Sequence, residues 1–425
     1  MATSPKKQPT SKVIKTTTTT ITRTASSSSG TKTASSLSST WKRNTFRINA
    51  AIAVIVAALS YNFVKDVIID SGLLLGTVQP FNTAGCEIVQ GLEACEDVHI
   101  HYASGLAFTT CGHAESRKGW YPPIGPVNTS AENAFKDKFV VYDIPSGKYN
   151  VMELVGLPAD VDRVYHGLDI YERSPTELTI FAVNHRRTGS VIEVLEYRIG
   201  DKAVQYKETI QHKLIRTPND IVALGPRSFY VSNDHRHSTG IMRGIEEFSR
   251  RPWSNVVYYS PEKTFVAYEH VVTANGMAAN LDRSLIYLSA CHGGAMHVLQ
   301  PNEDHSLIIQ DYIKLDFYND NPSYDPATGD VFVAGHVQPL TMVKHLHTKG
   351  RSVDGPSKIV KMSKNPEANT VSGAPKYLVE TVLVDDGNLI STSTTAAVDR
   401  KRGVMLVGTA FSDRGLVRCP IPKGI

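Results

Sequence analysis

The sequence predicts an all-β protein: a six-bladed β-propeller preceded by a disordered tail and a single N-terminal membrane-anchor helix. Short β runs recur in the second part of the chain, and most of them follow a turn. Their spacing is irregular, roughly 45 to 75 residues, and a period of that order with several strands per unit is typical of a β-propeller. An uncharged apolar run near the start predicts the anchor. The six β runs are residues 105–108, 178–183, 228–231, 284–288, 330–334 and 403–407.

Six runs of this kind predict six blades, which we assign to residues 80–425. A two-sheet sandwich is the alternative, but roughly 340 residues of uninterrupted short strands is long for that fold. Hydrophobic residues make up 41% of the chain and charged residues 20%, as expected for a globular protein. No P-loop, dinucleotide fingerprint or Cys/His zinc spacing stands out, which disfavours those classes of protein.

Residues 1–46 predict a disordered tail, because Ser, Thr and Lys are abundant there and apolar residues are too few to form a core. Residues 1–65 contain no Asp or Glu. The small formal net charge of +4 is therefore concentrated in this segment rather than on a folded face. We expect no nucleic-acid partner.

Residues 47–65 predict a transmembrane signal anchor. The apolar run within them, residues 48–64, is near the lower length limit of a membrane span. Basic residues before the run indicate a cytosolic N-terminus, so the chain would be a single-pass membrane protein with its propeller lumenal or extracellular. The long polar leader argues against a cleaved signal peptide, whereas its basic, acid-free composition leaves mitochondrial targeting as an alternative. Asn128 begins the only glycosylation sequon, which would be used if the propeller faces a lumen.

The five cysteines leave the disulfide pattern open. Their odd number requires at least one thiol that is free or paired between chains. Cys86 opens the folded part and Cys419 nearly closes it, so a bridge between them would tie the ends of a closed fold in an oxidising compartment. Buried free thiols are the alternative.

Acidic and amide residues recur in adjacent pairs beside β runs that are far apart in the chain. Taken singly, such a pair more often marks a turn. A propeller, however, brings its channel-lining strands to one axis, where these side chains would form a cage of oxygen ligands suited to calcium. We expect one calcium ion at Glu96, Asn219, Asn275, Asp320 and Asn321, and a second, deeper ion at Asp97 and Asp220.

Two histidines beside β runs are candidates for acid–base chemistry. His166 would act as a general base on water, with His185 fixing its tautomer and raising its basicity. A histidine at a strand edge is more often a structural residue, and that interpretation stays open for both. The chain has no Gly-x-Ser-x-Gly elbow, which disfavours a serine hydrolase of the α/β type.

Several motifs in this chain resemble those of the paraoxonase/arylesterase family of calcium-dependent lactonases. The specific ones are the Asn-Asp-Ile-Val-Ala sequence of residues 219–223 and the Tyr-Tyr-Ser-Pro sequence of residues 258–261. The similarity covers roughly residues 80–420. Cys95, Cys111 and Cys291 do not follow the usual free-thiol pattern of the family, and their state is left open.

The resemblance implies a six-bladed propeller with one catalytic and one structural calcium ion in its tunnel. It assigns the five residues of the first cage to the catalytic calcium, and Asp97, Asp220 and the backbone carbonyl of Leu168 to the structural calcium. It implies a His166–His185 dyad and a disulfide between Cys86 and Cys419.

The expected function is therefore that of a membrane-anchored, calcium-dependent hydrolase acting on small-molecule lactones or aryl esters. Calcium would polarise the carbonyl group and stabilise the oxyanion, while the histidine dyad activates water. Two alternatives remain from the sequence. One is a gluconolactonase-like or strictosidine-synthase-like propeller enzyme, and the other is a non-catalytic propeller scaffold braced by calcium.

Overall fold

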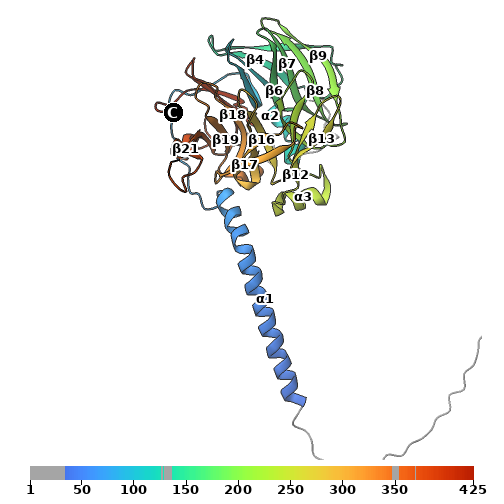
Figure 1. Ribbon diagram of the computed structural model, residues 1–425, viewed down its shortest axis with the longest axis vertical. Helices are drawn as coiled ribbons and strands as arrows, with labels where there is room; N and C mark the ends of the chain where they lie inside the picture. Colours follow the sequence, from blue (N-terminus) through green and yellow to red (C-terminus); the bar gives the residue numbers. More distant parts are fainter. Residues whose placement is uncertain (1–33, 126–127, 129–135, 347–353, 369) are drawn as a thin grey trace, which may run out of the picture. The chain divides into compact units, whose positions relative to one another are not determined.

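A computed structural model describes residues 34–125, 128, 136–346, 354–368 and 370–425 of the chain. They form one long N-terminal helix and an all-β, propeller-like unit (Figure 1). The chain divides into two compact units, Met1–Phe63 and Val64–Ile425. Of the tail predicted to be disordered, residues 1–33 lie outside the described residues, and the remainder belongs to the helix.

The helix α1 spans Ala34–Asp70 and extends beyond the predicted apolar run at both ends. Its segment Trp41–Asp70 is long and apolar enough to cross a membrane. The run contains no proline or glycine, and its one internal serine, Ser60, donates to the carbonyl of Val56 at 2.7 Å, so the helical hydrogen bonding continues through it. The prediction of one N-terminal apolar helix is confirmed.

The first part of the β unit is a sheet of eight strands in the order β2-β3-β4-β5-β9-β8-β7-β6. It consists of two antiparallel meanders whose outermost strands, β5 and β9, pair in parallel. The strands are β2 (Glu93–His101), β3 (Leu106–Gly112), β4 (Lys138–Asp143), β5 (Lys148–Val155), β6 (Tyr165–Ser174), β7 (Glu177–Arg186), β8 (Gly189–Arg198) and β9 (Ala203–Ile210).

Three further sheets are antiparallel meanders of four consecutive strands each. The first sheet holds β10 (Pro218–Ala223), β11 (Phe229–Asn233), β12 (Ser254–Tyr259) and β13 (Thr264–Val271); the second holds β14 (Ala274–Ala279), β15 (Ile286–Ala290), β16 (Ala295–Pro301) and β17 (Leu307–Lys314); the third holds β18 (Tyr318–Tyr324), β19 (Val331–His336), β20 (Ser357–Lys364) and β21 (Tyr377–Asp385). Figure 1 labels β12, β13, β16, β17, β18, β19 and β21 of these sheets.

The last sheet combines the two ends of the β unit. Its order is β1-β24-β23-β22, with β1 (Glu87–Ile88) from the start of the unit and β22 (Ser393–Asp399), β23 (Val404–Thr409) and β24 (Leu416–Pro420) from its end. A disulfide between Cys86 and Cys419, 333 residues apart, lies beside this closure. A second disulfide, which the sequence left open, joins Cys95 to Cys111 across β2 and β3, and among the described residues Cys291 is a buried free thiol.

The innermost strands contact one another around a closed ring. β2 contacts β6 and β22, and the contacts continue from β6 to β10, β14, β18 and β22. Apolar side chains fill the spaces between neighbouring sheets; for example, Val183 and Ile192 pack with Ile221 and Val231. Each fully buried side chain of this kind contributes roughly 1.5–3 kcal/mol. The core therefore lies between the sheets, and polar side chains can gather on the axis.

Each of the six innermost strands is interrupted by a β-bulge. A bulge leaves one residue without a ladder partner, bends the strand and redirects a side chain. Two adjacent residues can then both face the axis instead of alternating across the sheet. The residues inside these register shifts include Glu96 and Asp97 in β2, His166 and Gly167 in β6, Asn219 and Asp220 in β10, Asn275 and Gly276 in β14, Asp320 and Asn321 in β18, and Thr394 in β22.

Short helices lie outside the sheets. They are α2 (Ala114–Arg117), α3 (Gly240–Ser249) and α4 (Pro339–Leu346), together with the 3-10 turns η1 (Pro122–Ile124) and η2 (Cys291–Gly293). Residues of α3, α4 and η1 contribute to the wall of the central cavity described below.

Candidate active site

The innermost strands surround a cavity of about 880 Å³. Four of the five predicted ligands of the first calcium line it, and so does His166, the predicted general base. The bulges contribute to this convergence, because the predicted ligands lie inside the register shifts of β2, β10, β14 and β18, where the strand bends and a side chain is redirected. The four ligands that line the cavity are Glu96, Asn219, Asn275 and Asp320.

Several oxygen atoms of this cage are buried and have no hydrogen-bond donor among the described residues. Asn321 donates to Glu96 Oε1 at 2.7 Å, which leaves the other carboxylate oxygen of Glu96 free to face the cage. Unsatisfied buried oxygens are costly unless a cation binds them. Among the described residues, the buried oxygens without a hydrogen-bond partner include Glu96 Oε2, Asn219 Oδ1, Asp320 Oδ1 and Asn321 Oδ1.

Two glycines are needed for the cage residues to approach one another. A Cβ atom at Gly276 would lie 2.2 Å from Asn321 Oδ1 and 2.4 Å from Asn321 Cα. A Cβ atom at Gly167 would lie 2.3 Å from Asp220 Oδ1. Both distances are far below van der Waals contact, so any larger residue would displace a predicted ligand.

The carboxylates strongly perturb one another. Burial, and then the charges of Asp320 and Asp97, raise the pKa of Glu96 well above its usual value. Burial also raises the pKa of Asp320 and of Asp220. A divalent cation would reverse this penalty by pairing with the ionised forms. The donor set, two carboxylates and three amides, fits a hard cation such as calcium.

A second acidic group lies next to the first. Asp97 and Asp220, the predicted structural-calcium ligands, are joined there by His99, which the sequence reasoning did not select. One ligand atom from each of the three residues lies within 4.8 Å of the other two. Leu168 contributes a backbone N–H to this group, donating to Asp97 Oδ2 at 3.1 Å.

The two histidines of the predicted dyad lie next to each other. His166 Nδ1 and His185 Nε2 are 3.1 Å apart, and His185 Nδ1 is 2.8 Å from Ser190 Oγ. His166 Nε2 faces the cage and lies 3.7 Å from Glu96 Oε1. His166 therefore contacts the cavity directly, while His185 supports it from behind.

Burial and a nearby cation keep both histidines neutral. Burial, His185 and Arg117 together lower the pKa of His166 well below its usual value. Burial lowers the pKa of His185 to about 4. Arg117 is fixed in the core by Asp137, whose Oδ2 accepts from Nη2 at 2.8 Å. Neutral imidazoles at pH 7 are able to accept a proton.

Two aromatic residues that the sequence reasoning missed complete this side of the site. Trp120 Nε1 donates to the carbonyl of His185 at 2.7 Å, which fixes the dyad's backbone. Tyr121 stacks edge-on against His166 with ring centroids 5.1 Å apart, and its buried hydroxyl has no hydrogen-bond partner among the described residues. The nearby Tyr121 and Trp120 follow no recognisable motif, so the sequence offered no signal for them.

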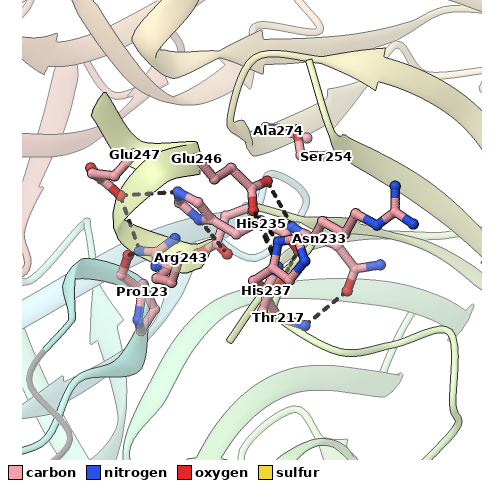
Figure 2. Close-up of polar contacts among 12 residues, drawn as sticks. Pro123, Thr217, Asn233, His235, His237, Arg243, Glu246, Glu247, Ser254 and Ala274 are labelled. Atoms are coloured by element: carbon pink, nitrogen blue, oxygen red, sulfur yellow. Dashed lines mark hydrogen bonds and ion pairs between the residues drawn. The ribbon is translucent and has the colours of Figure 1, made fainter. Parts of the chain in front are cut away.

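A polar cluster from α3 forms another part of the cavity wall (Figure 2). His235 Nε2 is 3.0 Å from Glu247 Oε2, and Arg243 Nη2 is 3.3 Å from the same oxygen. Arg243 also donates to the carbonyl of Pro123 at 2.5 Å, which ties α3 to η1. Although burial opposes it, the charges of His292 and His235 lower the pKa of Glu247 to about 2. Glu247 therefore stays ionised at the cavity wall.

The end of α1 also contributes to the cavity. Asp70 is fully buried; Arg250 Nη2 donates to it at 2.6 Å and Lys314 Nζ at 2.7 Å. This ion-pair cluster, which we call the Asp70 clamp, fixes a segment from which Val67, Ser71 and Leu73 line the cavity. A propeller domain beginning at residue 80, as the sequence suggested, would lack that part of the wall.

Replacing Asp70 with asparagine is expected to lower the free energy of unfolding by about 2 kcal/mol, the scale of a hydrogen bond to a charged group. The substitution removes the charge that Arg250 and Lys314 share. Denaturant unfolding of the full chain in detergent measures the loss. Asp66→Asn, one turn earlier on an exposed face of α1, is the matched control. Equal stability of the two variants would contradict a stabilising role for the clamp.

Comparison with known proteins identifies the family. A family model described as Arylesterase matches residues 77–417. The protein is thus an enzyme of the carboxylic ester hydrolase class, and it belongs to the arylesterase family. The resemblance seen in the sequence is confirmed.

The chain is similar to curated relatives over most of their length. It is 29% identical to serum paraoxonase/arylesterase 1 of Mus musculus over 340 residues, which covers 79% of this chain and 88% of the relative. It is 27% identical to serum paraoxonase/lactonase 3 of Oryctolagus cuniculus over 336 residues, with the same coverage. Among solved structures, a luciferin-regenerating enzyme aligns with a TM-score of 0.48 and 13% identity, covering 81% of this chain and 96% of that one.

Proposed function

We propose that this protein is a calcium-dependent hydrolase of lactones and aryl esters. The observation that carries the proposal is the pairing, in one cavity, of buried oxygens that lack partners with a neutral histidine dyad. A scaffold braced by calcium would need the oxygens but not the dyad. Membership of the arylesterase family, and the names of the relatives, support the choice of substrate class.

The residues around the cavity have distinct roles in the proposed hydrolysis. When bound by the cage, calcium would supply Lewis-acid polarisation of a substrate carbonyl. His166 accepts a proton from water at Nε2, the nitrogen that faces the cavity, while its Nδ1 is held by His185. Ser190 fixes the orientation of His185, and Tyr121 shields His166 from bulk water. The apolar part of the wall, which includes Phe411 and Leu340, would bind the acyl chain or aryl group.

We also infer that the propeller has six blades. The strands of the two meanders β2–β5 and β6–β9 pair with each other only between β5 and β9, over Glu153–Val155 and Ala203–Gln205, so we count them as separate blades. The closed ring of six inner strands and the bulge in each of them support this count.

A second cation and a membrane topology complete the proposal. We assign the second cation to Asp97, Asp220 and the carbonyl of Leu168, for which the sequence predicts calcium.

We propose that α1 is a signal anchor with the β unit lumenal or extracellular. Two disulfides suit an oxidising compartment, and Asn128 is exposed. Protease digestion of the propeller from the cytosolic side of sealed microsomes would argue against this topology.

The first test is hydrolysis of a lactone and aryl-ester panel by the full chain, with chelator and then with added calcium. We expect activity to disappear on chelation and to return with calcium. A folded, calcium-binding protein that hydrolyses no member of the panel would favour the non-catalytic scaffold. Activity that survives complete removal of metal would remove calcium from the reaction.

The His166→Gln variant is expected to lose about 10²–10⁴-fold in kcat/KM, the usual contribution of a general base. His113→Gln, at a mostly exposed position outside the cavity, is the matched control and should retain activity. Full lactonase activity in His166→Gln would exclude His166 as the base and leave Asp320 as the candidate.

The pH dependence follows from the lowered pKa values. Because burial lowers the pKa of His185 to about 4, and that of His166 also falls, the base form persists well below the ordinary histidine range. At saturating calcium, kcat/KM should hold its plateau at pH 6 and fall only as the pH approaches 4. Between the unfolded value of about 6.5 and the folded value, the unfolded chain binds more protons, so stability decreases as the pH falls through that window. An acid limb centred near 6.5 would contradict these assignments.

A further inference from the structure

The strand β2 is irregular on both sides of a single residue. Its pairing with β3 shifts once before Cys95 and again after it, so Cys95, which lies opposite Cys111, is the one residue of 94–97 with a partner in this ladder. The segment that presents the first ligand of the cage is therefore held by the neighbouring strand at one position only. The residues of this segment without a ladder partner are Ala94, Glu96 and Asp97.

A disulfide fixes that one position. Cys95 and Cys111 are bonded to each other, and both side chains are buried. The other edge of β3 is regular, because its pairing with β4 runs from Leu106 to Cys111 without a register shift. The bond thus attaches an irregular strand to a regular one, directly before the predicted ligand Glu96. Among the described residues, no other innermost strand carries a disulfide.

The backbone beside the disulfide is held in an unfavourable conformation. Ala94 has a φ of +48°, in the left-handed region that residues other than glycine rarely adopt. Such a conformation persists only where the surroundings fix it. The N–H of Ala94 donates to the carbonyl of Ser412 at 2.8 Å, and a Cβ atom at Gly408 would lie 2.4 Å from the carbonyl oxygen of Cys95. The segment therefore fits closely against β23 but has a tendency to relax.

Negative charge adds to this tendency. The raised pKa of Glu96 reflects its burial first and then the charges of Asp320 and Asp97. Without a cation, repulsion among these carboxylates favours movement of the segment away from the axis. The contacts of Glu96 that oppose such movement include Asn321 Nδ2, which donates to Oε1 at 2.7 Å, and Thr394 Oγ1, which donates to the backbone carbonyl at 2.5 Å. A covalent bond one residue away opposes it more firmly.

We propose that the Cys95–Cys111 disulfide is a positioning element of the first cage, which preorganises Glu96 for calcium. Once the bond is absent, calcium has to select the competent geometry from a mixture, and its apparent affinity falls in proportion to the population of that geometry. Calcium affinity then depends on whether this disulfide has formed. The inference rests on the calcium cage of the proposed function, and the two cysteines act through Glu96 rather than on substrate.

The test is calorimetric titration of the metal-free full chain, in detergent, with calcium. We expect the Cys95→Ala/Cys111→Ala double variant to bind calcium about 10–100-fold more weakly than the unaltered chain, the range for losing a group that orients a metal ligand. The kcat for lactones at saturating calcium should approach that of the unaltered chain, because excess calcium selects the competent geometry.

Two further variants separate positioning from stability and from packing. The Cys86→Ala/Cys419→Ala double variant removes a disulfide between two residues that do not line the cavity, and it should keep its calcium affinity. The Cys95→Ala/Cys111→Val double variant restores buried volume without restoring the bond, so it should bind calcium as weakly as the double-alanine variant. It replaces the double-alanine variant in the test if that protein fails to fold.

Four outcomes would overturn the proposal. Calcium affinity unchanged in Cys95→Ala/Cys111→Ala would remove the positioning role. An equal loss of affinity in Cys86→Ala/Cys419→Ala would assign the effect to general loss of stability. Full affinity in Cys95→Ala/Cys111→Val would assign it to packing, and a kcat that stays low at saturating calcium would show an effect beyond positioning.

The calorimetric readout also keeps the two proposals apart, because it needs no turnover. An unaltered chain that binds calcium but hydrolyses no lactone or aryl ester would contradict the hydrolase proposal alone. A calcium-dependent hydrolase whose calcium affinity is the same with and without the Cys95–Cys111 bond would contradict the positioning role alone.

Discussion

Replacing Glu96 with glutamine is expected to lower kcat/KM for lactones by about 10²–10³-fold, the scale of losing one preorganised oxyanion-stabilising group. Glu96 supplies one of the two negative charges of the first cage, and its Oε2 has no other partner among the described residues. The amide keeps the size of the side chain but removes the charge and one ligand oxygen. Calcium titration should show a parallel loss of affinity.

The matched control is Glu303→Gln, which makes the same chemical change on an exposed loop. It should leave both calcium affinity and activity unchanged. If Glu96→Gln bound calcium as tightly as the unaltered protein and kept its activity, the first cage would not be the catalytic metal site.

Removing the Cys86–Cys419 disulfide is expected to cost about 2–5 kcal/mol of stability, the usual range for a native disulfide. This bond closes a loop of 333 residues, so in the chain-entropy account its loss frees a large unfolded ensemble. The paired variant Cys86→Ala with Cys419→Ala should unfold at lower denaturant concentration. Its activity at low temperature should be retained, because neither cysteine lines the cavity.

The second disulfide provides an internal comparison. Cys95 and Cys111 are 16 residues apart in a single hairpin, for which the same account gives about 3 kcal/mol. The Cys95→Ala/Cys111→Ala double variant should therefore lose less stability through its shorter loop than the Cys86→Ala/Cys419→Ala double variant. The cavity left by replacing two buried cysteines adds to its loss and narrows the difference between the two variants. If removal of the Cys86–Cys419 disulfide left the free energy of unfolding unchanged, the pairing of β1 with β24 would be sufficient to keep the ring closed.

The residues of the first cage could be predicted from sequence for a physical reason. Asn and Asp are poor strand formers, so their repeated occurrence beside β runs indicated a shared functional role. The alternation of an extended strand would send Glu96 and Asp97 to opposite faces. The structure has a β-bulge at that pair, which changes the local backbone. A bulge has no recognisable pattern in a single sequence, so it could not be predicted.

Other features were outside the reach of the sequence. His99 was missed because its ring nitrogens lie next to Asp97 and Asp169, contacts that correspond to no sequence motif. The Cys95–Cys111 pairing could not be chosen among the alternatives that five cysteines allow. Asp70 looked like the polar end of a membrane span, and only its burial against Arg250 and Lys314 connects it with the cavity.

The mixed origin of the last sheet has a consequence for biosynthesis. β1 leaves the ribosome first and its partner β24 last, so the ring cannot close until nearly the whole β unit has been translated. At about 5–20 residues per second, the 333 residues between the two bridged cysteines require roughly 20 to 70 seconds. Throughout that interval the nascent chain is an open arc with an unpaired strand edge, which is prone to aggregate. We therefore expect chaperones that shield such edges to act on the nascent chain mainly during this interval.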